Sequence, residues 1–161
     1  MWSSVYRVSG GIIVLWLSAC TMQQPQQYAQ PGGGALAQTQ LEVGLGDLEQ
    51  ERLQLAQQHL EKAVFHASPL HPVWRKAHYG LALSYLRSGE DGRSEHYFLR
   101  ALQGEASYPE AENGLGVLFC RQGRMAEANG YFQRAIDNPH YSTPEVARKN
   151  RDACSGKGMS E

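Results

Sequence analysis

Apolar, small and polar residues follow the same order in two segments of the chain. The segment G-L-A-L-S-Y-L-R-S-G at 80–89 superposes on G-L-G-V-L-F-C-R-Q-G at 114–123. Each segment has the apolar spacing of a helix, then a glycine, then a second helical pattern. Repetition of this helix-turn-helix unit predicts an all-α fold of stacked helix pairs. The matched pairs are Leu81 and Leu115, Ala82 and Gly116, Tyr85 and Phe119, Gly89 and Gly123, Ser94 and Ala128, Phe98 and Phe132, Ala101 and Ala135, and Leu102 and Ile136.

The unit resembles the tetratricopeptide repeat of about 34 residues, in which large residues face small ones so that neighbouring helices approach closely. A weaker copy occupies about residues 37–70, where Asp47 replaces the aromatic residue and Glu51 replaces the turn glycine. Gly44 and Gly46 weaken its first helix by about 1 kcal/mol each relative to alanine. The resemblance implies a superhelix of about three repeats within a domain that covers residues 37–154.

A single helix is expected after the third repeat. Pro139 ends that repeat, and S-T-P-E at 142–145 offers a hydroxyl cap with proline and glutamate in the first turn. The predicted helix runs to about Cys154 and covers the apolar end that a repeat stack otherwise exposes. Residues 155–161 are expected to form a disordered tail.

The first nineteen residues have the layout of a signal peptide. Arg7 precedes an apolar run at 8–17, which is shorter than the roughly 20 residues that a membrane-spanning helix needs. The next residues complete the sequence L-S-A-C at 17–20, which resembles the lipobox of bacterial lipoproteins. The resemblance implies acylation of Cys20, and Thr21 then favours the outer membrane, where the protein would face the periplasm. The alternative is an ordinary signal peptide with a chance cysteine.

Residues 20–36 are expected to form the lipidated cysteine and a flexible tether, because they are uncharged and rich in Gln, Pro and Gly. Loss of the leader would leave 14 basic residues against 16 acidic ones. The basic residues are scattered along the chain, so nucleic acid is not an expected partner. The membrane is expected to be reached only through the N-terminal lipid.

Cys120 and Cys154 are exactly one repeat length apart, so they occupy equivalent positions on the first helices of consecutive repeats. Acylation of Cys20 would leave these two thiols in an oxidising compartment, where disulfides persist. A disulfide between them is expected. The alternative is a pair of reduced, half-buried cysteines that act as small apolar residues.

The stretches 113–128 and 138–154 are similar to repeat lipoproteins required for type IV pilus biogenesis and stability, including the pilotins that assist secretin assembly. Leu118 and Phe119 reverse the Phe-Leu order of that family, and the chain has three and a half repeats where the family usually has about six. The matching residues are Asn113, Gly116, Phe119, Cys120, Gly123, Arg124, Asn138, Pro139, Tyr141, Thr143, Pro144, Asn150 and Cys154. The resemblance implies an outer-membrane scaffold that binds the secretin or another pilus component. An adaptor for another envelope or secretion complex is the alternative.

The first helices of such repeats line a concave groove. A leucine strip with flanking arginines there suggests a site for an extended or helical apolar peptide. The alternative is that these leucines pack inside a tightly wound stack. The predicted groove residues are Leu41, Leu45, Leu48, Tyr79, Leu83, Leu86, Arg87, Asn113, Val117 and Arg121.

Catalytic and metal-binding patterns are not apparent in the sequence. The six histidines have no ligand spacing, and no Ser-His or Cys-His arrangement is evident. The glycine pairs at 44–46 and 114–116 lie in predicted helices and follow no strand, which argues against nucleotide binding. We therefore expect a protein that is not an enzyme and uses no cofactor or metal.

Overall fold

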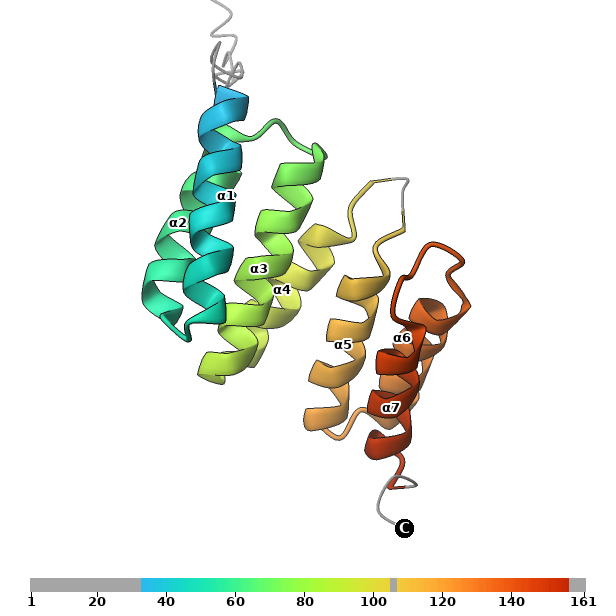
Figure 1. Cartoon of the computed structure of the whole chain (residues 1–161). Helices are drawn as coiled ribbons and strands as arrows, with labels where there is room; N and C mark the ends of the chain where they lie inside the picture. The colour runs from blue at the N-terminus through green and yellow to red at the C-terminus, as the bar shows by residue number, and fades with distance from the viewer. Residues whose placement is uncertain (1–32, 105–106, 157–161) are drawn as a thin grey trace, which may run out of the picture.

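The computed structural model describes residues 33–104 and 107–156, and these form seven α-helices. Consecutive helices run in opposite directions and pack as pairs, and α7 packs against α5 and α6 (Figure 1). The prediction of an all-α fold of stacked helix pairs is confirmed. The helices are α1 (Gly33–Glu49), α2 (Leu53–His66), α3 (Pro72–Ser88), α4 (Asp91–Ala101), α5 (Pro109–Arg121), α6 (Met125–Asp137) and α7 (Pro144–Cys154).

The first helix is longer than the sequence predicts. It begins at Gly33, so residues 33–36 belong to α1 and not to the tether. Gly33 fits there because a Cβ at this position would lie only 3.1 Å from the carbonyl oxygen of His66, and Ala37 anchors the first turn with 1% of its surface exposed. The predicted leader, Cys20, the tether up to residue 32 and the end of the tail at 157–161 lie outside the described residues.

The interior consists of two large apolar clusters and a small one. An N-terminal cluster joins α1, α2 and α3, and a C-terminal cluster joins α3 to α6. The small cluster ties α7 to α6 through Ala135, Tyr141 and Ala147. Leu83 and Tyr97 pack against both large clusters, which makes the core continuous along the stack.

The first repeat lacks the aromatic residue and the turn glycine of the later repeats, and it has polar contacts and an unusual backbone conformation in their place. Asp47, only 3% exposed, accepts hydrogen bonds from the guanidinium of Arg52. Glu51 adopts a left-handed conformation with φ of 56°, where the later repeats have Gly89 and Gly123 at φ of 79° and 75°. The first repeat therefore forms without the aromatic residue and the glycine that its sequence lacks.

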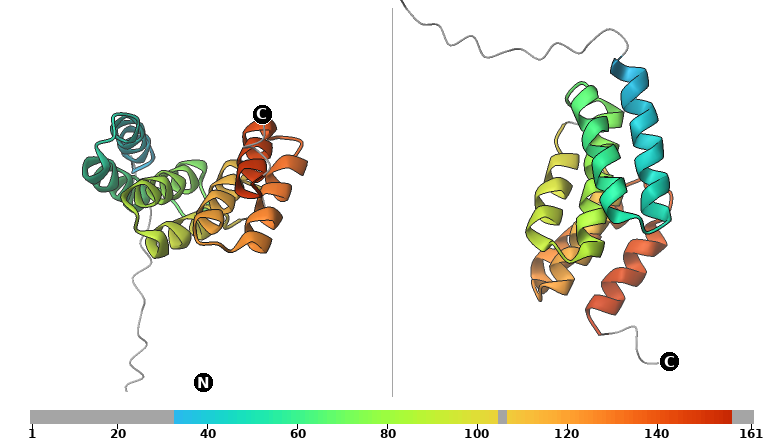
Figure 2. Two further views of the ribbon diagram at one scale, coloured as in Figure 1. Left: turned by 90° about the horizontal axis from the view of Figure 1, so that it is seen from below. Right: turned by 90° about the vertical axis from the view of Figure 1, so that its left-hand side faces the viewer.

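The helix pairs follow an arc, with the odd-numbered helices on the inside and the even-numbered helices on the outside (Figure 2). Two edges run along this arc. The turn edge contains the tight turns at 50–52, 89–90 and 122–124. The loop edge contains the described residues of the longer connections at 67–71, 102–104, 107–108 and 138–143, together with the first turn of α1.

Contacts between neighbouring connections hold the loop edge together. Gly33 lies against His66, and Leu70 Cδ2 is 3.8 Å from the position that a Cβ would take on Gly104. The side chain of Asn138 donates a hydrogen bond to Ser107 Oγ. The start of α1 and the three connections therefore lie side by side.

Candidate functional site on the concave surface

Six of the predicted groove residues lie on the inner helices with part of their surface accessible. Leu45, Leu83 and Leu86 pack sideways on the core clusters, as do Tyr79 and Val117. Asn113 is also partly accessible, and its Oδ1 accepts a hydrogen bond from Asn150 Nδ2 at 3.1 Å. Apart from Leu45, which lies on α1, these residues give the inner side of α3 and α5 an apolar strip with a polar end at α7.

Leu41 and Leu48 are not part of this strip, and their prediction as groove residues is wrong. They are 2% and 4% exposed and belong to the N-terminal cluster together with Ala77 and Leu81 of α3. Residues of α2 and α3 together form most of the rest of this cluster, so the alternative of internal packing applies to these two leucines.

Arg87 and Arg121 are committed to contacts between repeats. Arg87 Nη1 donates to the carbonyl oxygen of Leu48 at 2.8 Å and pairs with Glu51 at 3.0 Å. Arg121 Nη1 donates to the carbonyl oxygen of Leu86 at 2.7 Å and pairs with Asp91. Each arginine thus caps the end of the preceding inner helix, where cations and donors are favourable.

Sequence reasoning missed this use of the two arginines. The signal was present, because the two arginines occupy the same position in consecutive repeats and each preceding turn carries an acid. Because both arginines make contacts between repeats, the concave strip is mainly apolar.

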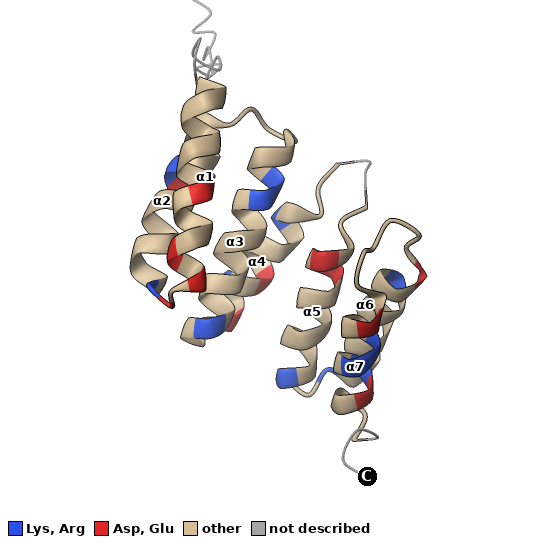
Figure 3. Ribbon diagram, in the orientation of Figure 1, with Lys and Arg blue, Asp and Glu red and all other residues tan. Residues whose placement is uncertain are grey.

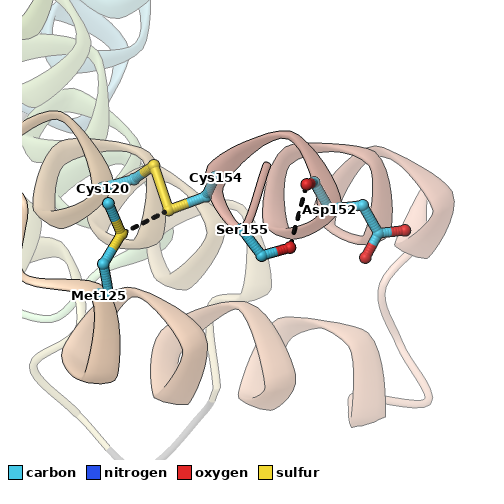
Figure 4. Close-up of a disulfide and its surroundings, with 5 residues drawn as sticks. All are labelled: Cys120, Met125, Asp152, Cys154 and Ser155. Atoms are coloured by element: carbon cyan, nitrogen blue, oxygen red, sulfur yellow. Dashed lines mark hydrogen bonds between the residues drawn. A yellow bond between two sulfur atoms is a disulfide. The ribbon is translucent and has the colours of Figure 1, made fainter. Parts of the chain in front are cut away.

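A disulfide joins Cys120 of α5 to Cys154 of α7 (Figure 4). The Cα atoms are 5.8 Å apart, within the usual range for a disulfide. Met125 Sδ lies 3.4 Å from Cys154 Sγ, and because a disulfide sulfur carries no hydrogen, this is a packing contact. The disulfide holds α7 against α5. At the two earlier junctions between inner helices, Arg87 and Arg121 make the corresponding connection.

A pocket of about 280 Å³ opens beside this disulfide, between α5 and α7. Its size is just below the range usual for small-molecule sites, and its lining is mainly apolar. It suits one apolar side chain of a bound peptide. Val117 connects the pocket to the concave strip. The lining residues are Val117, Cys120, Phe132, Asn150, Ala153 and Cys154.

Aromatic residues pack together where α3 meets the start of α5. The rings of Tyr79 and Tyr108 have centroids 5.3 Å apart, and the guanidinium of Arg75 lies 5.2 Å from the centroid of Tyr108. Burial raises the pKa of Tyr79 to about 12, and burial also raises the pKa of Tyr108. Both phenols are therefore neutral at physiological pH and offer apolar area with a polar tip.

Glu112 is a partly buried acid on α5 that the sequence patterns did not indicate. Its Oε2 is buried and lacks a hydrogen-bond partner. Burial raises the pKa of the carboxyl, and the charge of Arg134 opposes this effect. Nothing in its spacing distinguishes it from a surface glutamate, since burial depends on how α5 packs.

Residues 33–104 and 107–156 contain no group of three or more potential metal ligands. Within the same ranges, the helices are too short or too polar to cross a bilayer.

Comparison with known proteins identifies the repeat. A tetratricopeptide-repeat family model matches residues 43–109 and 79–142. The chain is 25% identical over 135 residues to an uncharacterized protein of Haemophilus influenzae, an alignment that covers 84% of this chain and 72% of the relative. No solved structure gives a significant match. The constant repeat length, the paired helices and the family match together show that the chain belongs to the tetratricopeptide repeat family.

Proposed function

We propose that this protein is a lipid-anchored scaffold of the bacterial outer membrane that binds a pilus component and assists type IV pilus biogenesis. The secretin is the proposed partner. The observation that carries the proposal is the apolar concave strip with its pocket, which suits a peptide and contains no array of catalytic groups among the described residues. Tetratricopeptide repeats generally act as protein-binding scaffolds, and the motif at 113–154 supports the assignment to pilus assembly.

The proposed binding mode is an extended or helical peptide laid along α3 and α5. One apolar side chain would enter the pocket at Val117, and neighbouring side chains would cover Leu83 and Leu86. Burial of about three such side chains contributes several kcal/mol to binding before the costs of association are subtracted.

Replacement of Leu83 by aspartate tests this mode, with Leu55→Asp as the matched control. Leu55 lies on the outer helix α2 and is 44% exposed, so its replacement leaves the concave strip intact. Leu83→Asp is expected to abolish binding of the purified periplasmic secretin domain in calorimetry, whereas Leu55→Asp is expected to bind like the wild type.

Val117→Trp provides a second test, because it fills the pocket without adding a charge to the core. It is expected to weaken binding of the secretin domain while the far-ultraviolet circular dichroism stays unchanged. Unchanged affinity in both folded concave variants would exclude the concave surface as the binding site.

A deletion strain tests the assignment to pili. We expect loss of twitching motility and of secretin multimers, with both restored by the wild-type gene. Normal twitching and normal multimers would favour the alternative of an adaptor for another envelope complex.

A further inference from the structure

The chain enters the folded domain at the loop edge. Helix α1 begins at Gly33, against His66 at the end of α2. Cys20 lies thirteen residues upstream, and thirteen residues span at most about 45 Å. A lipid on Cys20 would therefore keep the loop edge, where the chain enters the domain, within reach of the bilayer.

Exposed apolar side chains are concentrated at this same edge. Of eight large apolar residues that are exposed in the described part of the chain, five lie within about one helical turn of the loop edge. Only Leu55 and Met125 lie near the turn edge, and Val43 lies midway along α1. The five are Leu36 at 42% exposed, Phe65 at 71%, Leu70 at 53%, Leu99 at 44% and Val146 at 42%.

Ion pairs are concentrated at the opposite edge. Six of the eight ion pairs found among the described residues involve groups in or next to the tight turns, such as Arg93 with Glu90 and Arg124 with Glu127. Figure 3 shows charged residues at the turn edge, whereas the described connections of the loop edge are mostly uncharged. The two edges therefore differ in polarity.

Charge near the loop edge is mixed. Lys62, Lys76 and Arg134 are exposed within about one turn of it, and so are Glu61, Asp137 and Glu145. This balance does not favour a strongly basic or acidic partner. Apolar side chains beside lysines instead suit the boundary between lipid headgroups and acyl chains.

We propose that the loop edge is a membrane-contact surface, through which the domain rests on the bilayer with Phe65 and Leu70 inserted among the headgroups. The inference rests on the proposed lipid anchor at Cys20. Each side chain alone adds little affinity, but a tethered domain meets its own membrane at high effective concentration. When the domain rests on this edge, the concave strip faces parallel to the membrane plane and stays accessible to a partner.

A tryptophan placed in the contact tests the proposal. If the leader is removed, Trp74 is the only tryptophan in the chain, and it is 5% exposed. The Phe65→Trp protein, produced at full length with its leader and purified, is reconstituted in phosphatidylethanolamine–phosphatidylglycerol vesicles with or without brominated acyl chains. Met125→Trp is the matched control, because Met125 is 46% exposed at the turn edge.

The bromine atoms are expected to quench the Phe65→Trp emission more strongly than the Met125→Trp emission, since Trp74 contributes equally to both. The quenching is expected to persist at about 1 M salt, where the screening length is about 3 Å, because the contact is mainly apolar. Equal quenching of the two variants, or none in either, would overturn the membrane contact. A lipid-independent blue shift of Phe65→Trp that grows with protein concentration would overturn it in favour of self-association.

Vesicle flotation separates this inference from the anchor on which it rests. Wild type is expected to float with the vesicles, and Cys20→Ala produced without residues 1–19 is expected to remain mostly unbound. Equal flotation of the two would reject the anchor. Flotation of wild type without quenching of Phe65→Trp would reject only the edge contact.

Discussion

Two glycines in adjacent helices are predicted to respond in opposite ways to the same substitution. Gly114 lies in α5 beneath the ring of Phe98, and a Cβ there would be 2.3 Å from Cε1 and 2.5 Å from Cζ of that ring. Gly130 lies in α6, and a Cβ there would meet nothing within 4 Å. Alanine therefore adds a clash at the first site and none at the second.

The expected magnitudes follow from these distances. Replacing a helical glycine by alanine contributes about 1 kcal/mol of stability where space is free, which raises the melting temperature by about 4 °C in a domain of this size. At Gly114 the ring of Phe98 would have to move by more than 1 Å to reach an ordinary carbon contact of about 3.5 Å. Phe98 is fully buried, so overpacking of about 1–3 kcal/mol is expected to exceed the propensity gain.

Thermal and urea unfolding, followed by circular dichroism, measure both variants. Gly130→Ala is expected to melt above wild type and Gly114→Ala below it. Phe98→Leu should lose less stability in the Gly114→Ala background than in wild type, because it removes the clashing ring atoms. A Gly114→Ala protein as stable as Gly130→Ala would refute the claim that this glycine is required for close helix packing.

Two further predictions concern the disulfide and a buried histidine. Replacing Cys120 and Cys154 together by alanine is expected to lower the free energy of unfolding by up to about 4 kcal/mol, given their sequence separation of 34. Hydrogen exchange should show that α7 opens first in this variant. Unchanged exchange in α7 would contradict the prediction. His78 is 3% exposed, and burial lowers its pKa from 6.5, so the neutral form stabilises the fold above the unfolded pKa. The free energy of unfolding is therefore expected to fall as the pH drops below about 6.5, and to fall less steeply in His78→Phe. Urea unfolding at several pH values measures this, and an equal pH dependence in the two proteins would refute the role assigned to His78.

The repeat register was predictable because the chemistry of each repeat is local. Gly89 and Gly123 follow inner helices in left-handed conformations, as the turn glycines of the repeat predict, and Pro72 and Pro109 stand in first turns, where proline is favoured. The spacing of the cysteines also points to neighbouring positions on inner helices. Each of these features depends only on residues within one repeat or in the next repeat along the chain.

The concave surface was less predictable because it depends on how tightly the repeats wind. Leu41 and Tyr79 both fall at predicted groove positions, yet Leu41 is buried in the N-terminal cluster whereas Tyr79 keeps part of its surface accessible. The contacts of Arg87 and Arg121 with carbonyl oxygens of earlier helices likewise require the superhelical geometry. A periodic pattern specifies which face of a helix is inner, but not how far the next helix covers it.

The position of the candidate site follows from how each junction between inner helices is closed. Leu41 and Leu48 fill the junction of α1 and α3 with apolar packing, which leaves little surface there for a partner. At α5 and α7, the disulfide of Cys120 supplies the connection instead, and a pocket remains open beside it at Val117. A covalent link needs less buried area to hold two helices together than apolar packing does. The disulfide therefore lets the C-terminal half keep an accessible apolar surface, and binding is expected there and not at α1.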